Sequence, residues 1–345
     1  MSQRLCTKCG NLLTPEDRFC VMCGTPVSPA QSTPAGIVER WAGHSAPVRS
    51  LAISRDGSRL LSGSEDGTVR LWDTAAGKEV LRLAIGGTQV TSVRFSPDQD
   101  RAVVGYGDNR IRIFDLTRGA CTATLSGHTS YVSGVAWSPD GRTIWSVSWD
   151  KTVRAWDSTV GIELHRLEGH GNYVDCVAIS PDGRWIASGS MDETVRVWEA
   201  NTGRPAAVLK SKDSYGSHFH SLAFSPDGRL LVATSLAAEA IVWDLASMQI
   251  ARQFEGHVGN VFAVAWSKDG RRIVTAAGTD FFDEELRREF GTDNTCRVWD
   301  LGTGQEIQRY TGHSGNVNAV VLSPDGSTAF SAGREGMVHQ WAVNR

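Results

Sequence analysis

The feature that most constrains the fold is a repeat of about 42 residues that begins near residue 37. Positions equivalent to the histidine of the repeated Gly-His pair lie at 44, 86, 128, 170, 215, 257 and 313, so the steps are 42, 42, 42, 45, 42 and 56 residues. The last step equals one repeat plus an insertion of 14 residues (56 − 42). An aromatic residue ends each of the seven units: Trp72, Phe114, Trp156, Trp198, Trp243, Trp299 and Trp341.

Each unit contains short runs of β-branched and aromatic residues, such as 132–137, 143–148 and 152–156 in the third unit. Turn signals of the Asp-Gly type separate these runs, as hairpin strands require, and no helical periodicity interrupts them. The 36 glycines of the chain serve these turns. The pattern predicts an all-β chain with four strands per unit.

Four strands in 42 residues, with Gly-His at the start and Trp-Asp at the end, resemble the WD-repeat (WD40) family. This resemblance implies a seven-bladed β-propeller over residues 37–345. It also implies that residues 37–41 complete the last blade, because the chain ends just after the third strand of the last unit. A closed ring of this kind leaves few exposed sheet edges.

Four cysteines near the N-terminus form two Cys-x-x-Cys pairs, Cys6 with Cys9 and Cys20 with Cys23, each followed by glycine. Two such pairs supply a tetrahedral set of four thiolates. The segment resembles the short bacterial zinc ribbons, which implies a structural zinc ion with no open coordination position. Two disulfides or a rubredoxin-like iron are the alternatives, and a reducing compartment disfavours the first. Nothing beside the cysteines indicates an electron-transfer partner for the second.

The sequence divides into three parts: a zinc ribbon at 1–27, a Pro/Ser-rich linker at 28–36 and the propeller at 37–345. The N-terminal residues lack the apolar core of a secretory signal, so we expect a cytoplasmic protein. Apolar runs of about six residues are too short to span a bilayer. A net charge of −3 gives no basic footprint for nucleic acid.

A hydrolase triad is a tempting interpretation of His44, Asp66 and the nearby Ser62 or Ser64. The same set recurs in other units, whereas a catalytic triad is needed only once, so we interpret it as a network that fastens each blade and expect no enzyme. The second and fifth units lack parts of this set, and we expect their blades to be the least stable. The departures are Gly86, Phe114, Tyr215, Ala237 and, in the seventh unit, Glu335 for Asp.

Two positions in each unit indicate where a partner binds, one three residues after the histidine and one just before the turn aspartate. In the family both lie on the face around the central channel. The third and fourth units place large side chains there, and these are the candidate partner-binding residues: Tyr131, Trp149, Tyr173 and Met191. Clustered aromatic residues are typical of interface anchors. The alternative is that these rings cap the blade interior.

Two further features are weaker. The insertion at 279–292 carries Phe282, Leu286 and Phe290 on one stripe of a predicted short helix, which either flanks the channel or packs locally. His218 and His220 share one strand face, but no third metal ligand is evident.

These observations favour a non-enzymatic scaffold that binds a protein or peptide on the propeller and uses the zinc ribbon as a second contact module. The alternative is a nucleic-acid- or ribosome-associated factor that uses the ribbon, because Arg4, Lys8 and Arg18 accompany the cysteines.

Overall fold

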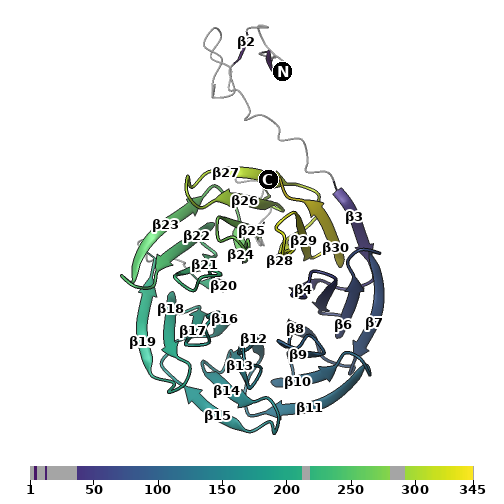
Figure 1. The fold of residues 1–345 in the computed structure, drawn as a ribbon, viewed down its shortest axis with the longest axis vertical. Coiled ribbons are helices and arrows are strands. Elements are labelled where there is room, and N and C mark those ends of the chain that lie inside the picture. The colour runs from purple at the N-terminus through teal and green to yellow at the C-terminus, as the bar shows by residue number, and fades with distance from the viewer. Residues whose placement is uncertain (1–3, 6–11, 14–36, 212–217, 280–291, 345) are drawn as a thin grey trace.

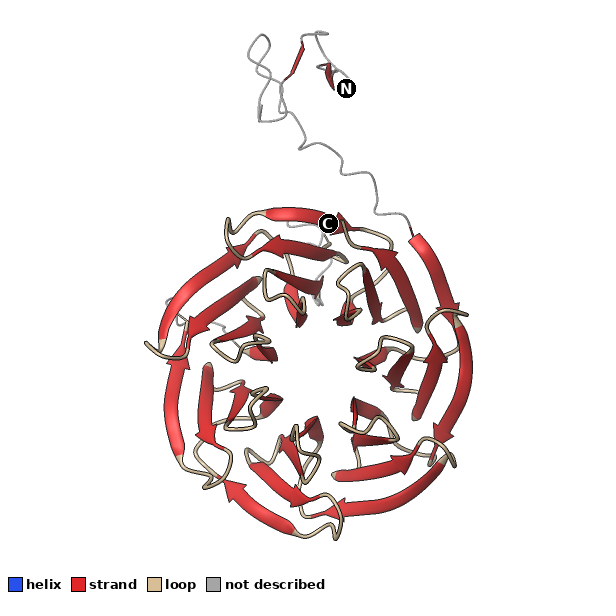
Figure 2. Cartoon of the chain, viewed as in Figure 1, coloured by secondary structure: helices blue, strands red, loops and turns tan. Residues whose placement is uncertain are grey.

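The protein is a ring of seven antiparallel sheets around a central channel (Figures 1 and 2). A computed structural model describes residues 4–5, 12–13, 37–211, 218–279 and 292–344. These residues form strands and connecting turns, with no helix among them. The predicted all-β, seven-bladed propeller is confirmed.

Four strands build each blade, and the first of the four lines the channel. Blades one to four consist of β4 (Val48–Ile53), β5 (Arg59–Ser64), β6 (Thr68–Asp73) and β7 (Lys78–Ala84); β8 (Val90–Phe95), β9 (Arg101–Tyr106), β10 (Arg110–Asp115) and β11 (Ala120–Ser126); β12 (Val132–Trp137), β13 (Thr143–Ser148), β14 (Val153–Asp157) and β15 (Glu163–Leu167); and β16 (Val174–Ile179), β17 (Trp185–Ser190), β18 (Thr194–Glu199) and β19 (Pro205–Lys210). Blades five to seven consist of β20 (Phe219–Phe224), β21 (Leu230–Ser235), β22 (Glu239–Asp244) and β23 (Gln249–Glu255); β24 (Asn260–Trp266), β25 (Arg272–Gly278), β26 (Cys296–Asp300) and β27 (Glu306–Tyr310); and β28 (Val317–Leu322), β29 (Thr328–Gly333), β30 (Met337–Ala342) and β3 (Ile37–Ala42).

The seventh blade joins the two ends of the propeller. Its sheet has the order β28-β29-β30-β3, so the strand at 37–42 lies outermost beside the last strand of the chain (Figure 1). Arg40 pairs with His339 and Trp41 with Val338 in this antiparallel ladder. The backbone groups of β30 are therefore paired on both sides, which removes an exposed sheet edge.

Repeated Ser-x-Asp-Gly turns join the first two strands of most blades. In blade one the Ser54 hydroxyl donates to Asp56 Oδ1 at 2.6 Å, and Gly57 takes a positive φ of 78°. Glycine adopts this conformation without the steric cost of a Cβ atom. The turn therefore follows from the sequence of each unit and sets the register of its first hairpin.

The hydrophobic core lies between neighbouring blades. Between blades two and three, for example, Ile111 and Leu125 pack with Val135 and Trp156, and all four are buried. Each seam repeats this arrangement with residues of two adjacent sheets. The blades consequently support one another and leave their loops to carry function.

Several sequence predictions concern residues outside the described part of the chain. These are the cysteines Cys6, Cys9, Cys20 and Cys23, the substituted Tyr215 and the helix predicted within 279–292. In the ribbon segment, β1 (Arg4–Leu5) pairs antiparallel with β2 (Leu12–Leu13). A search of the described residues finds no helix long and apolar enough to cross a bilayer.

Candidate functional site

A hydrogen-bond network holds the Gly-His loop of blade one to its strands. His44 Nδ1 donates to Asp66 Oδ2 at 2.9 Å, and its Nε2 meets the Ser62 hydroxyl at 2.7 Å. The Trp72 indole N–H donates to the same hydroxyl at 2.8 Å. Burial lowers the pKa of His44. Burial also works to raise the pKa of Asp66, but hydrogen bonds, including those from Thr68 and His44, outweigh it and lower that pKa to about 2.

The same network recurs around the ring, which identifies its role. It joins His128 with Asp150, Ser146 and Trp156; His170 with Asp192, Ser188 and Trp198; His257 with Asp293, Thr275 and Trp299; and His313 with Glu335, Ser331 and Trp341. A buried network that recurs in five blades fastens loops to strands, as the sequence predicts.

Blades two and five use other contacts at the same place. In blade two the Arg112 guanidinium donates to both carboxylate oxygens of Asp108, at 3.0 and 2.6 Å, and lies 4.7 Å from the centre of the Tyr106 ring. In blade five the buried Glu239 accepts from Gln253 and Ser211. That these two blades are the least stable stays a prediction.

One face of the propeller carries the Gly-His loops together with the turns that join the second and third strands of each blade. We call it the Gly-His face. On this face three rings of blades three and four stack in a row. The centre of the Trp149 ring lies 4.6 Å from that of Tyr131 and 5.0 Å from that of Tyr173. Tyr173 leaves 39% of its surface exposed, and Tyr131 and Trp149 are half-buried.

Backbone hydrogen bonds fix this row to its blades. The Trp149 N–H donates to Tyr131 O at 3.0 Å, and the Met191 N–H donates to Tyr173 O at 2.9 Å. The structure therefore brings the four candidate residues together on one sector. We call Tyr131, Trp149 and Tyr173 the ring row. Met191 lies beside Tyr173, at one end of this row. The rings cover one another in part, and the exposed face of Tyr173 stays open to solvent.

Asp175 supports the ring row through a hydrogen bond from Trp149. Sequence reasoning did not identify this residue. Its Oδ1 accepts the Trp149 indole N–H at 2.9 Å. Its Oδ2 is buried without a hydrogen-bond partner in the described part of the chain, and His220 Nδ1 stays 3.7 Å away. Burial raises the pKa of Asp175 to about 6, although the Trp149 bond acts in the opposite direction.

The register of Asp175 explains why this carboxylate is unusual. Side chains at the equivalent position of three other blades donate to the neighbouring inner strand: Thr91 to Val132 O at 2.6 Å, Ser133 to Val174 O and Asn318 to Val48 O at 3.0 Å. A carboxylate cannot donate, so at the seam of blades four and five the Cys176 thiol donates to Phe219 O instead, at 3.4 Å. The sequence signal for Asp175 lay in comparing its position across the seven units, in addition to the two positions of each unit compared above.

Asp175 also lines the central cavity, which has a volume of about 800 Å³. The equivalent positions of all seven blades line it: Arg49, Thr91, Ser133, Asp175, His220, Phe262 and Asn318. Burial is the main cause that lowers the pKa of His220 to about 4, with a smaller contribution from the charge of Arg49, so its imidazole is neutral near pH 7. In the described residues His218 and His220 belong to no group of three metal ligands. This end of the cavity thus carries a neutral imidazole and a carboxylate of raised pKa.

The ribbon segment fits a zinc ion by the chemistry of its donors. Cys6 and Cys9 lie in the segment that connects the paired strands β1 and β2, and Cys20 and Cys23 follow at the spacing of a second pair. Four thiolates in two such pairs match the tetrahedral preference of Zn²⁺.

Two known family models match the chain. The WD domain, G-beta repeat model matches seven segments, 36–73, 79–115, 119–157, 161–199, 209–244, 248–300 and 304–342, which together make up most of the chain. The zinc-ribbon domain model matches residues 5–27, which indicates zinc binding.

Curated relatives match only part of the ring. Guanine nucleotide-binding protein subunit beta-1 of Caenorhabditis briggsae is 33% identical over 85 residues, which are 25% of this chain and 21% of the relative. Guanine nucleotide-binding protein G(I)/G(S)/G(T) subunit beta-1 of Homarus americanus is 32% identical over 87 residues, again 25% and 21%. The chain spans about a fifth of the length of these relatives, so the likeness covers about two repeat units.

Proposed function

Because the chain belongs to the WD40-repeat family, we propose that it is a non-enzymatic scaffold that binds a protein or peptide on its Gly-His face. The ring row of Tyr131, Trp149 and Tyr173, with Met191 beside it, is the anchor of this site. Family membership supports the scaffold role in general, since the propeller with its partial G-beta likeness suggests a non-catalytic interaction family. The site must be argued from its own residues.

The observation that carries the proposal is the stack of three rings on one sector of a face whose other blades place mostly small or polar side chains at the same positions. The other blades place Pro47, Gln89, His218, Asn260 and Asn316 at the position of the two tyrosines. Aromatic rings that are already ordered lose little conformational entropy when they bind. The open face of Tyr173 suits a proline, an aromatic ring or an arginine of the partner, each of which stacks on a flat apolar surface.

Asp175 is the positioning residue of this site. Its bond to the indole N–H fixes the plane of Trp149, and the ring stack transmits that orientation to both tyrosines. A buried carboxylate with an unused oxygen costs stability. An amide that donates to the neighbouring inner strand, as Asn318 does to Val48 O in blade seven, has no such cost.

The ribbon is the second contact module of the proposal. We assign 1–27 to the ribbon, 28–36 to the linker and 37–345 to the propeller. Cys6, Cys9, Cys20 and Cys23 hold a structural zinc ion that supplies the folding energy of a segment with few apolar residues. A cytoplasmic location and a bacterial source belong to the same proposal. The relatives matched by the propeller are animal proteins.

Affinity purification of the full chain with a Trp149→Ala variant tests the site, with bound proteins identified by mass spectrometry. Trp185→Ala is the matched control, because Trp185 is also half-buried but begins β17 at the opposite end of the blade. We expect a set of proteins that is captured by the wild type and by Trp185→Ala but is lost with Trp149→Ala. Circular dichroism must show that all three proteins are folded. Equal capture by the two variants contradicts the proposed site. Capture of RNA through residues 1–36 instead supports the nucleic-acid alternative.

A further inference from the structure

Blade seven departs from the other blades at two buried positions of its fastening network. Glu335 lies 22 residues after His313, where the other complete networks carry an aspartate. His339 lies two residues before Trp341, where an arginine precedes the tryptophan in blades one, three, four and six. Both changes bring metal-ligating side chains into one place.

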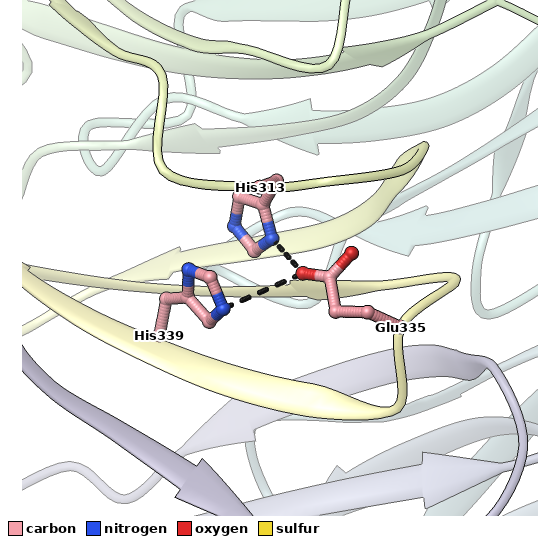
Figure 3. Close-up of side chains that lie close together, drawn as sticks. All are labelled: His313, Glu335 and His339. Atoms are coloured by element: carbon pink, nitrogen blue, oxygen red, sulfur yellow. Dashed lines mark hydrogen bonds and ion pairs between the residues drawn. The ribbon is translucent and has the colours of Figure 1, made fainter.

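The imidazoles of His313 and His339 converge on one carboxylate oxygen of Glu335 (Figure 3). His313 Nδ1 donates a hydrogen bond to Glu335 Oε1, and His339 Nε2 lies 3.5 Å from the same oxygen. The two imidazole rings stack with their centres 3.9 Å apart. Their side chains are buried, with 0% and 2% exposed, whereas 12% of the Glu335 side chain is exposed.

Two atoms of this cluster are buried without a hydrogen bond from the described residues: Glu335 Oε2 and His339 Nε2. The other ring nitrogens are held from outside the cluster. His339 Nδ1 meets the Tyr310 hydroxyl at 2.9 Å, and His313 Nε2 meets the Ser331 hydroxyl at 2.6 Å. Ligating histidines in proteins are usually held in this way through the nitrogen that does not face the metal.

The charge balance of blade seven also differs from that of its neighbours. In blade three the Arg154 guanidinium lies between Asp150 and Glu163, at 3.3 and 2.7 Å, and Arg297 joins Asp293 and Glu306 in blade six. Blade seven has His339 in place of the arginine, and Ile37 pairs with Trp341 where those blades place the glutamate. The Tyr310 side chain lies beside Gly312, where the arginines of those blades approach the equivalent glycine, so among the described residues Glu335 pairs with the two histidines and with no guanidinium.

We propose that His313, Glu335 and His339 bind a divalent transition-metal ion, with Zn²⁺ as the best match to two imidazoles and a carboxylate. The ion takes the place of the proton between His313 Nδ1 and Glu335 Oε1. The His339 ring must tilt, because a metal cannot lie in the planes of two parallel rings at once. Glu335 Oε2 or a water molecule completes the coordination.

The location gives this site a structural consequence. His313 lies in the loop that follows β27, Glu335 in the turn between β29 and β30, and His339 on β30, which pairs with the N-terminal strand β3. A metal at this point links the loop between β27 and β28 to β30, the strand on which β3 closes the ring. Binding therefore stabilises the closure of the propeller.

Cobalt substitution of the full chain tests the proposal, because the two sites give different spectra. The four-thiolate ribbon produces strong sulfur-to-cobalt charge-transfer bands, and a site of two imidazoles and a carboxylate does not. We expect the wild type to bind a second equivalent of Co²⁺ without any increase in these bands. Glu335→Gln keeps the side-chain volume, and His339→Asn replaces the imidazole with a smaller polar group; each variant should lose that equivalent. His165→Asn, on a blade outside the cluster, is the control and should keep it.

Equal Co²⁺ uptake by the wild type and both variants overturns the proposal. If one variant fails to fold by circular dichroism, the other decides the result. X-ray absorption on the second equivalent in the wild type is independent of both. Two imidazoles with oxygen neighbours support the site, and a shell of sulfur contradicts it. A wild type that binds a single equivalent with the sulfur-to-cobalt charge-transfer bands also contradicts it, whereas a single equivalent without those bands supports the blade-seven site and contradicts the ribbon site.

Discussion

Asp150 and Asp175 lie close to the same tryptophan and show how a carboxylate that fastens a blade differs from one beneath the proposed binding site. Asp150 follows Trp149 in the chain, and its oxygens accept from His128, Thr152 and Arg154 at 2.8, 2.6 and 3.3 Å. Asp175 accepts one bond, from Trp149, and its second oxygen has no hydrogen bond from the described residues. Both carboxylates are buried, yet only one is satisfied.

The two environments move the pKa in opposite directions. Burial acts to raise the pKa of Asp150, but the bonds from His128 and Thr152 outweigh it and hold that pKa well below its usual range. Burial dominates at Asp175 and raises its pKa to about 6. A repeated network thus stabilises the ring, whereas the unsatisfied carboxylate under the ring row reduces stability. Residues that reduce stability in this way are typical of functional sites.

The largest expected effect is the loss of Asp150. Asp150→Ala leaves His128 Nδ1 buried without its carboxylate acceptor and leaves Arg154 with only the Glu163 carboxylate. We therefore expect a loss of about 3–5 kcal/mol in the free energy of unfolding, the range found when one partner of a buried pair is removed. Urea denaturation at pH 7 measures it. A loss below about 1 kcal/mol shows that the network does not fasten the blade.

Asp175→Asn should have the opposite sign. A carboxyl group whose pKa is higher in the folded state contributes most stability below its unfolded value of 3.8, and this contribution is lost as the pH rises through about 6. Asparagine removes the charge, keeps an acceptor for Trp149 and offers Phe219 O a donor.

We therefore expect Asp175→Asn to stabilise the protein at pH 7 by up to about 3 kcal/mol, from about 1.4 kcal/mol per unit of pKa. The two proteins should have similar stability at pH 4. Denaturation curves at both pH values provide the comparison. A variant less stable than the wild type at pH 7 shows that the carboxylate is satisfied in a way that the geometry does not reveal.

Trp149→Phe sharpens the comparison with a smaller change. Phenylalanine keeps an aromatic ring in the stack but removes the single donor to Asp175, a loss on the order of 1 kcal/mol. The pKa of Asp175 should rise above about 6, while Asp150 keeps its low pKa. Carboxyl ¹³C chemical shifts followed by NMR titration measure both groups in one sample. An unchanged pKa of Asp175 means that the indole bond has little weight.

The smallest effect is expected in blade two. Asp108 pairs with Arg112, but 27% of its side chain is exposed, so water replaces much of what the pair provides. Asp108→Ala should cost about 0.5–1 kcal/mol, well below Asp150→Ala. Urea denaturation of both variants under one condition makes the comparison. Equal losses indicate that blade two is fastened as firmly as blade three.

The repeat was enough to predict the fold, because the Gly-His pairs, the turn serines and the closing tryptophans have a fixed place in the repeat and occur in most blades. The ring row was also predictable, since Tyr131, Trp149 and Tyr173 occupy positions that all units share. Asp175 was missed because its role depends on which side chains donate to the next blade. His339 was missed because its meaning comes from Glu335 and His313, which are distant in sequence and meet only in the folded blade.

The most direct test of the account places a photo-crosslinking residue at position 173, the most exposed ring of the row, and at position 185 as the control on the opposite face. Each full-length protein is irradiated in cell extract, and its covalent adducts are identified by mass spectrometry. The account predicts adducts of a defined protein from position 173, suppressed by Trp149→Ala, with none of these from position 185. The same adducts from both positions, or adducts unaffected by Trp149→Ala, contradict it.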